Sequence, residues 1–198
     1  MKRVFDVFFS LFGIITFSPF FIIISIIIKL TSKGPIFYKQ KRVGLNCIDF
    51  NIFKFRTMRP NSDYLGLITV GDRDPRVTKI GYYLRKLKLD EFPQLFNVLF
   101  GQMSIVGPRP EVKKYVNHYS EEDLTVLQVK PGITDYASIK FRNENELLKG
   151  VIDVDKKYIE EIMPIKLSLN KKYISEKDTL KDLKIILKTF SSILKFNS

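Results

Sequence analysis

The chain has 198 residues, enough for one domain with a buried core after a membrane segment is set aside. Its net charge of +12 indicates anionic partners, either nucleic acid, phosphorylated substrates or an acidic membrane surface. The single cysteine, Cys47, excludes an internal disulfide, and no Cys/His cluster suggests zinc. Because His118 is the only histidine, the chemistry should rest on carboxylates and cations.

Residues 4–30 are almost wholly apolar and, as one straight helix, are long enough to span a bilayer. Lys2 and Arg3 precede this segment and several lysines follow it, so both ends should face the cytoplasm. Ser18 and Pro19 lie near its midpoint, where proline interrupts the helical hydrogen bonds and serine can bond a freed carbonyl. We therefore expect a membrane break at this pair and a re-entrant helical hairpin, with a kinked spanning helix as the alternative.

A β-hairpin is predicted next, from strand-like segments at 35–40 and 48–55 joined by a turn at 44–46. A polar, glycine-containing loop at 61–74 suits a mobile flap. Asp74 and Pro75 can open a helix whose buried stripe recurs at helical spacing in Val77, Ile80, Leu84 and Leu87.

The acidic pair Asp90-Glu91 directly precedes Phe92-Pro93. Because proline is tolerated in the first turn of a helix, the pattern predicts a helix from Glu91 to Phe100, ended by Gly101. Asp90 then lies at or next to the N-cap, where free N–H groups favour an anion. Such a carboxylate suits a phosphate-handling nucleophile or a metal ligand, with an ordinary capping aspartate as the alternative.

The rest of the chain is predicted to be mostly helical. We expect a helix at 112–127, a strand and turn at 129–134, and a capping box formed by Ser175 and Asp178. A final helix would present one apolar face formed by Leu180, Leu183, Ile186, Leu187, Phe190, Ile193 and Leu194. Its flanking lysines suit either packing on the domain or contact with an anionic membrane surface.

The central motif, LR-x-x-x-LDE-x-PQL-x-N-V-L-x-G-x-MS-x-VGPRPE, resembles that of the bacterial sugar transferases, the monotopic phosphoglycosyl transferases. The likeness also includes the apolar segment, KQKRVG, KFRTM and PGIT, and so extends over about two-thirds of the chain. It implies an α+β fold: a re-entrant membrane hairpin at 1–33, and a small cytoplasmic α/β catalytic domain with amphipathic interfacial helices at 34–198.

The resemblance implies an enzyme that transfers a sugar-1-phosphate from a nucleotide-diphosphate sugar, such as a UDP-sugar, to polyprenyl phosphate. The products would be polyprenyl-diphosphate-sugar and nucleoside monophosphate, formed through an aspartyl-phosphosugar intermediate. Location at the bacterial inner membrane, with the catalytic domain in the cytoplasm, is implied as well. Expected partners are the donor, the acceptor and membrane lipid, without nucleic acid; a homodimer is left open.

The resemblance also implies the site residues. Asp90 would be the nucleophile and Glu91 its catalytic partner, and both would bind Mg²⁺ or Mn²⁺. The expected substrate-binding residues are Lys54, Arg56, Arg85, Pro108, Arg109 and Arg142. Residues 135–141 depart from the family pattern of Gly, Gln and Asn-Gly-Arg-Asn, which leaves the sugar and the nucleotide open.

Two readings from other classes compete with this one. A membrane-tethered nucleic-acid binder would explain the positive charge but not the acidic pair or the proline-flanked arginine. A catalytically inactive scaffold is suggested only by the divergent segment at 135–141, and the intact central motif speaks against it.

Overall fold

A computed structural model of the chain describes residues 2–60, 62, 68 and 74–194, with side chains as far as residue 192. Most of the flap predicted at 61–74 lies outside these residues. The helices and strands are α1 (Lys2–Thr31), β1 (Phe37–Val43), β2 (Asp49–Phe55), α2 (Lys79–Lys86), α3 (Gln94–Leu99), β3 (Ser104–Val106), α4 (Lys113–Val116), β4 (Gly132–Thr134), α5 (Tyr136–Lys140), α6 (Glu144–Leu147), α7 (Val154–Lys157), α8 (Met163–Glu176) and α9 (Thr179–Leu194).

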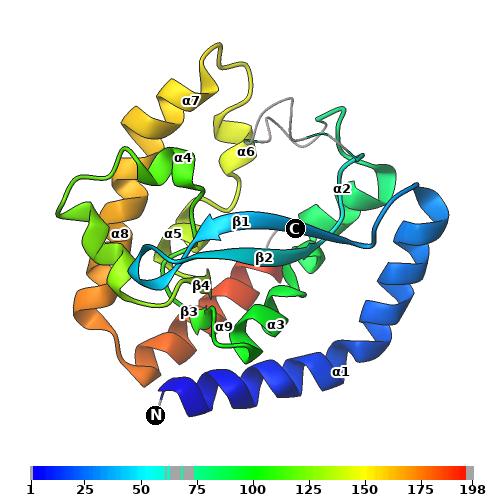
Figure 1. Ribbon diagram of the computed structural model, residues 1–198, viewed down its shortest axis with the longest axis horizontal. Helices are drawn as coiled ribbons and strands as arrows, with labels where there is room; N and C mark the ends of the chain where they lie inside the picture. Colours follow the sequence, from blue (N-terminus) through cyan, green and yellow to red (C-terminus); the bar gives the residue numbers. More distant parts are fainter. Residues whose placement is uncertain (1, 61, 63–67, 69–73, 195–198) are drawn as a thin grey trace.

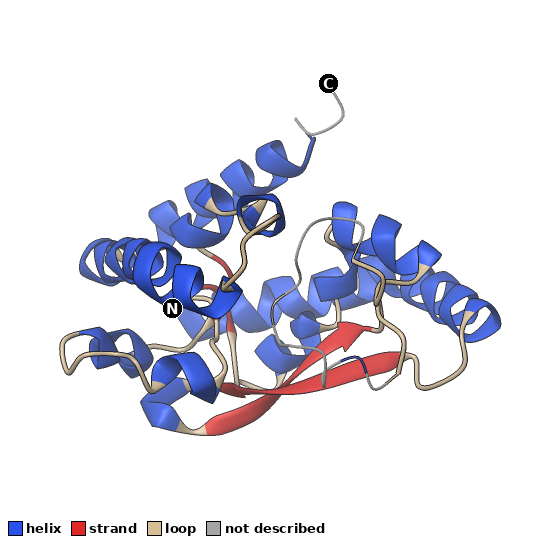
Figure 2. Ribbon diagram, turned by 90° about the horizontal axis from the view of Figure 1, so that it is seen from above, coloured by secondary structure: helices blue, strands red, loops and turns tan. Residues whose placement is uncertain are grey.

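Helices and strands are mixed, as the predicted α+β class requires, and the described strands form two small sheets. β1 and β2 are antiparallel, with Phe37 opposite Phe55 and Val43 opposite Asp49, which confirms the predicted hairpin. β3 and β4 are parallel, so the chain segments that leave these two strands start side by side. Figure 2 shows the β1–β2 hairpin as a long ribbon at one edge, with the helices on one side of it.

The N-terminal segment is one helix, α1, that contains Pro19 and bends around the rest of the chain (Figure 1). Proline cannot donate to the carbonyl four residues earlier, which here belongs to Ile15. The Ser18 hydroxyl donates to that same carbonyl at 2.8 Å, as the sequence suggested. Of the described helices, α1 is long and apolar enough to cross a membrane, and most of its apolar side chains are exposed.

The start of α1 is fastened to the domain by buried and half-buried polar contacts. The Arg3 guanidinium donates to the carbonyls of Val98 and Leu99, at 2.6 and 2.8 Å, and so satisfies the C-terminal end of α3. The buried Asp6 carboxylate accepts from the Ser104 hydroxyl at 2.9 Å, which ties α1 to β3. The first turns of α1 therefore pack on the same unit that holds the central motif.

The other end of α1 is fastened to the domain as well. The Arg56 guanidinium, at the end of β2, donates to the carbonyls of Ser32 and Lys33 at 2.9 and 2.5 Å. An apolar cluster joins α1 to β2 and α2 in the same region, formed by Ile24, Ile28, Phe55 and Leu84. Both ends of this apolar helix thus contact one protein body.

The central helix begins later than predicted. Residues Leu89–Glu91 form a separate 3₁₀ turn, and α3 starts only after Pro93, which is its N-cap. Lys88 enters the left-handed region with φ 58°, which redirects the chain just before the acidic pair. Asp90 consequently lies inside the 3₁₀ turn rather than at the N-cap of α3, whereas Gly101, with φ 84°, lies just past the helix end as expected.

α2 also begins later than predicted. Asp74 does not cap it, because its carboxylate forms an ion pair with Arg76 at 2.6 Å. Thr78 is the N-cap instead, and its side chain accepts from the Gly81 N–H at 3.0 Å. The buried side of α2 is centred on Leu84, while the predicted stripe member Leu87 is exposed.

Two predictions for the second half of the chain are wrong in detail. The long helix expected at 112–127 is replaced by the short α4 and a 3₁₀ segment, Asp123–Gln128. Ser175 does not cap the last helix, because it lies inside α8 and its hydroxyl donates to the Lys172 carbonyl. Four members of the predicted apolar face of α9, Leu180, Leu183, Leu187 and Phe190, are exposed, and the helix packs on the domain through Ile185, which the prediction did not include.

Candidate active site

Glu91 lies at the centre of a cluster of charged side chains that come from three parts of the chain. Its carboxylate accepts from Lys54 Nζ, on β2, at 3.1 Å. It also accepts from both terminal nitrogens of Arg109, on the loop after β3, with Nη1 at 3.0 Å. The Glu91 side chain is only 12% exposed, and that of Arg109 is 36% exposed. In this bidentate pair the Glu91 carboxylate is protected, whereas solvent or a ligand can reach the Arg109 guanidinium.

The charges in this cluster shift each other's proton affinity. Burial favours the neutral acid, but the charges of Arg109 and Lys54 outweigh it and hold the pKa of Glu91 well below its usual range. The charge of Glu91 in turn raises the pKa of Arg109. Burial lowers the pKa of Lys54, although Glu91 opposes this effect. Glu91 is therefore ionised at neutral pH and compensates two cations.

Asp90 lies beside this cluster in a different electrostatic state. Its side chain is buried, and its Oδ1 atom has no hydrogen-bond partner among the described residues. Burial and then the neighbouring charge of Glu91 raise the pKa of Asp90, while Lys54, Lys88 and Arg85 act in the opposite direction. A buried carboxylate oxygen without a partner, among cations, is chemically available as a nucleophile or as a ligand.

Arg109 is carried by a loop that packs tightly on β4 and on the segment after it. The Gly132 N–H donates to the Pro108 carbonyl at 2.9 Å, and a Cβ added at Gly132 would lie 2.1 Å from the Gly107 backbone. The Arg109 N–H donates to the wholly buried Asp135 carboxylate at 3.1 Å. The same carboxylate accepts from the Ser138 N–H at 2.5 Å and caps α5. These contacts therefore fix the loop that carries Arg109, and Glu91 holds its guanidinium.

Known proteins share the sequence motifs that form this site. The family model described as bacterial sugar transferase matches residues 1–196. The chain belongs to the bacterial sugar transferase family. It is 42% identical over 142 residues to a UDP-N-acetylgalactosamine-undecaprenyl-phosphate N-acetylgalactosaminephosphotransferase of Aeromonas hydrophila, which covers 70% of this chain and 34% of that protein.

Two further relatives are informative. A UDP-glucose:undecaprenyl-phosphate glucose-1-phosphate transferase of Xanthomonas campestris is 42% identical over 149 residues, 71% of this chain and 31% of that protein. An uncharacterized sugar transferase of Bacillus subtilis, EpsL, is 35% identical over 194 residues, 98% of this chain and 87% of that protein. The chain thus spans about a third of the length of the first two relatives and most of the third.

In this sugar transferase the site residues predicted from sequence are distributed unevenly. Lys54, Glu91 and Arg109 are in direct contact, and Asp90 adjoins them. The charge of Arg85 acts on Asp90, although no hydrogen bond joins the two. A role for each in binding or catalysis stays a prediction that this contact pattern favours.

Arg56 and Arg142 are not among the residues that contact Glu91. The Arg56 guanidinium is used at the end of α1, where it bonds the Ser32 hydroxyl and two carbonyls. It therefore has an anchoring role, and its role in substrate binding stays a prediction. Arg142 follows α5, and burial lowers its pKa. Its contact with a substrate also stays a prediction.

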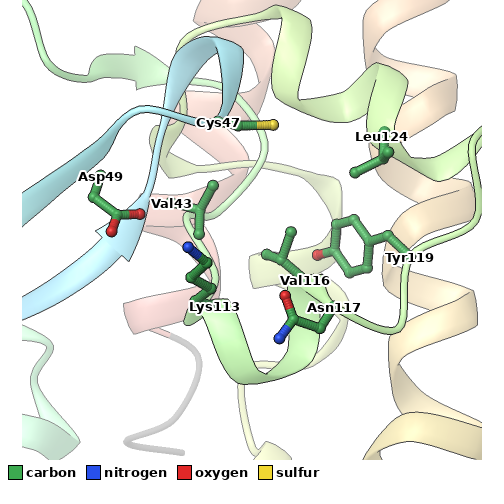
Figure 3. A pocket seen from close by; sticks show the side chains of 8 residues that line it. All are labelled: Val43, Cys47, Asp49, Lys113, Val116, Asn117, Tyr119 and Leu124. Carbon is green, nitrogen blue, oxygen red and sulfur yellow. The ribbon is translucent and has the colours of Figure 1, made fainter.

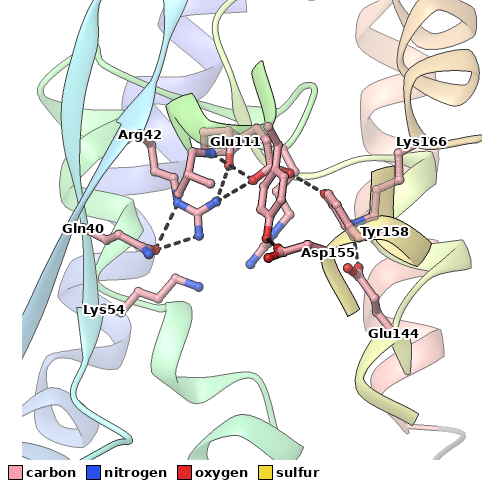
Figure 4. Close-up of polar contacts among 12 residues, drawn as sticks. Gln40, Arg42, Lys54, Glu111, Glu144, Asp155, Tyr158 and Lys166 are labelled. Atoms are coloured by element: carbon pink, nitrogen blue, oxygen red, sulfur yellow. Dashed lines mark hydrogen bonds and ion pairs between the residues drawn. The ribbon is translucent and has the colours of Figure 1, made fainter. Parts of the chain in front are cut away.

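A polar network that was not predicted from the sequence continues from the site toward α8 (Figure 4). Arg42, on β1, donates to Gln40 at 2.7 Å and to Glu111 at 3.1 Å. Glu111 also accepts from the Tyr158 hydroxyl, which in turn accepts from Lys166 at 3.3 Å. The signal was present, because Arg42 and Glu111 belong to the motifs KQKRVG and VGPRPE of the bacterial sugar transferases, but no role had been assigned to either.

Two buried amides of α3 were also missed. Asn97 accepts from the Phe53 N–H at 2.9 Å and donates to the Asn51 carbonyl at 2.8 Å, which fastens α3 to β2. Gln94 is wholly buried, and neither of its side-chain polar atoms has a partner among the described residues. Polar residues on the buried side of an amphipathic helix were the available signal for both.

The chain's oxygen donors can be tested against the divalent cation that the family resemblance implies. Mg²⁺ typically binds one or two carboxylates together with substrate phosphates. Asp90 offers its unpaired Oδ1, and Glu91 Oε2 accepts a single hydrogen bond and so retains a lone pair. No cluster of three or more His, Cys, Asp or Glu suited to a metal occurs among residues 2–60, 62, 68 and 74–194. The acidic pair fits a cation that substrate phosphates help to hold.

A separate pocket of about 340 Å³ lies at the turn end of the hairpin (Figure 3). Its walls come from the hairpin, from α4 and from the segment that follows, and include Cys47, Lys113 and Tyr119. None of the site residues predicted from sequence lines it. Lys54 pairs with Tyr38 at the opposite end of the hairpin, so this pocket is distinct from the charged cluster.

Proposed function

We propose that this sugar transferase moves a sugar-1-phosphate from a nucleotide-diphosphate sugar to a polyprenyl phosphate. The observation that carries the proposal is the acidic pair itself: Glu91 is held by Lys54 and Arg109, and Asp90 keeps an unpaired oxygen beside them. The names of the relatives from Aeromonas and Xanthomonas support a UDP-sugar donor and undecaprenyl phosphate as acceptor.

In the first step an Asp90 carboxylate oxygen forms a bond to the sugar-side phosphorus of the donor. The phosphorus–oxygen bond to the nucleotide breaks, and nucleoside monophosphate leaves with the electron pair. Arg109 and Lys54, which both pair with Glu91, neutralise the diphosphate as charge moves to the leaving group. Glu91 keeps the guanidinium in a fixed orientation until the phosphate arrives, because both of its oxygens bond Arg109.

In the second step an oxygen of the lipid phosphate bonds to the same phosphorus. The bond to Asp90 breaks, the carboxylate is restored, and polyprenyl-diphosphate-sugar is released. A bound divalent cation would supply charge neutralisation at the phosphate oxygens. The chain's own residues bind the donor, position the nucleophile and shield it from bulk water.

A panel of nucleotide sugars tests this function. The purified chain in membrane mimetics should convert at least one of them, with polyprenyl phosphate, into nucleoside monophosphate and a lipid-linked sugar, as measured by mass spectrometry. Salt-sensitive nucleic-acid binding without any turnover would instead favour the nucleic-acid binder.

A re-entrant path for α1 is part of the proposal. Arg3 and Asp6 bind the domain at one end of α1, and Arg56 binds the other end, so a straight passage to the far side of the membrane would break one set of contacts. Single cysteines at Lys2 and Lys33, in a chain whose Cys47 is replaced by Ser, should be labelled from the same side of sealed vesicles. Labelling from opposite sides would leave a spanning helix as the correct topology.

The substitution Pro19→Leu tests whether the proline sets the re-entrant path of α1. It restores the N–H that the helix lacks, so we expect part of the population to become transmembrane and the two cysteines to differ in accessibility. An identical labelling pattern with and without Pro19 would show that the proline does not set the path.

A divalent cation should be required for turnover. Because Asp90 and Glu91 offer only oxygen ligands, we expect activity with Mg²⁺ or Mn²⁺ and its loss in excess EDTA. Restoration by added Mg²⁺ controls for irreversible damage. Full turnover in chelator would remove the metal role of the acidic pair.

A further inference from the structure

A second pocket, of about 330 Å³, lies where α5, α8 and α9 meet. It is separate from the charged cluster around Glu91, because none of the residues of that cluster lines it. Its walls combine cationic, aromatic and aliphatic side chains, namely Tyr136, Ile139, Lys140, Leu169, Lys172 and Lys188. A cavity of this composition suits a ligand with an anionic group and an apolar part.

The three lysines of this pocket have no carboxylate partner among the described residues. On the same helices Lys166 pairs with Glu144 at 2.5 Å and Lys171 with Glu122 at 2.7 Å, whereas Lys184, which does not line the pocket, has no ion pair among the described residues. Three uncompensated like charges around one cavity repel each other, and an anion between them would remove that repulsion. The charge of the pocket therefore favours an anionic occupant.

The helix that forms one wall also presents an apolar surface to the outside. Leu180, Leu183, Leu187 and Phe190 lie on one side of α9 at helical spacing and are between 42% and 69% exposed. Lys184 and Lys188 border this stripe on the same helix, one turn apart. A helix with an exposed apolar stripe and a lysine border is typical of the surface of an anionic membrane.

We propose that the α5–α8–α9 pocket binds the phosphate of an anionic phospholipid headgroup. The phosphate oxygens accept from Lys140, Lys172 and Lys188, and the acyl chains lie along the exposed stripe of α9. Tyr136, whose hydroxyl has no hydrogen-bond partner among the described residues, is a further donor at the cavity. The site is independent of sugar transfer and would seat the C-terminal half of the domain on lipids of one charge class.

Lysine footprinting on the full chain tests the proposal. The chain is placed in nanodiscs of phosphatidylcholine alone or with phosphatidylglycerol, and lysines are acetylated and quantified by mass spectrometry. Acetylation of Lys140, Lys172 and Lys188 should fall several-fold in the anionic discs. The exposed Lys113, Lys149 and Lys156, which do not line the pocket, should change much less. Equal protection of both sets would reduce the effect to general surface charge and overturn the pocket.

Two additions decide between sources of phosphate. Millimolar inorganic phosphate in phosphatidylcholine discs should leave the three lysines reactive; protection equal to that by phosphatidylglycerol would overturn a lipid occupant. Protection only by polyprenyl phosphate would overturn the phospholipid and assign the pocket to the acceptor lipid.

Charge-matched variants provide the second measurement. The triple variant K140Q/K172Q/K188Q should retain several-fold less phosphatidylglycerol per chain after purification than K113Q/K149Q/K156Q, which loses the same charge. K140R/K172R/K188R, which keeps the three charges, should retain the lipid. Circular dichroism and Tm confirm that all three variants are folded, and equal retention by the two glutamine variants would overturn the proposal.

Discussion

Asp90→Asn should abolish both the release of nucleoside monophosphate from donor alone and the phosphosugar adduct on the protein. The change keeps the size of the side chain but removes the attacking anion, whose Oδ1 is unpaired and buried beside Lys54. We expect turnover to fall about 10³-fold or more, as for the loss of other enzymatic nucleophiles. Intact mass of the unsubstituted chain with donor alone should show an adduct that hydroxylamine removes, and monophosphate limited to about one per enzyme.

Asp153→Asn is the matched control, because Asp153 caps α7 at the surface and asparagine is an equally good cap. It should leave the adduct and turnover unchanged. Glu91→Gln should slow the reaction without relocating the adduct, because Glu91 orients Arg109 and does not itself attack. The covalent route is wrong if donor alone gives neither adduct nor monophosphate and both substrates must bind first.

Asp90→Asn should raise the thermal stability of the protein while it removes activity. Burial raises the folded-state pKa of Asp90, so its contribution to stability is complete below the unfolded-state pKa and is lost as pH rises through the folded-state pKa. This contribution therefore falls as pH rises above the usual aspartate pKa, and Asp90→Asn should increase Tm at neutral pH in EDTA by a few degrees, about 2–4 °C per kcal/mol. This gain should shrink as pH falls toward the usual aspartate pKa, and a lower Tm at neutral pH would contradict the electrostatic account.

Arg109→Lys should lower kcat/KM about 10²-fold or more even though it keeps a positive charge. Arg109 binds both oxygens of Glu91 with two parallel nitrogens, and the Asp135 carboxylate and Gly132 hold its loop. A lysine ammonium cannot reproduce that planar fork toward Glu91 or toward a phosphate, so a transition-state contact is lost. Steady-state kinetics with a nucleotide sugar and polyprenyl phosphate measure the effect.

Arg59→Lys is the control for the chemistry of the substitution, because Arg59 is exposed and has no contact with the charged cluster. It should leave kcat/KM within about twofold. If Arg109→Lys and Arg109→Ala both retain the original rate, Arg109 is a surface residue that happens to pair with Glu91, and the assignment of the site fails.

Local sequence was sufficient for several features because each depends on neighbours along the chain. The apolar composition of residues 4–30 predicted one long apolar helix, and the Ser18 hydroxyl bonds the carbonyl that Pro19 frees, while the re-entrant path stays a prediction. The hairpin and the helix end at Gly101 followed from strand patterning and from a residue that tolerates positive φ. The long central motif established the family.

Other features depend on contacts between distant parts of the chain, and no local pattern reports them. Lys54 lies on β2 and Arg56 directly follows that strand, yet one bonds Glu91 and the other bonds the end of α1. Alternate residues of a strand share a face, but which neighbour each meets is set by how α1 and the central motif pack on the hairpin.

Asp135 shows most clearly the difference between what the local sequence indicates and what the tertiary structure decides. By sequence it was only a departure from the family pattern in a polar stretch. In the fold the parallel pairing of β3 with β4 places the ends of both strands together, and the wholly buried Asp135 carboxylate bonds the Arg109 N–H. The sequence by itself determined the family, the long apolar N-terminal helix and the acidic pair. Tertiary packing alone decided which cations compensate Glu91 and left the buried Asp90 oxygen unpaired, because burial and ion pairing depend on distances across the fold.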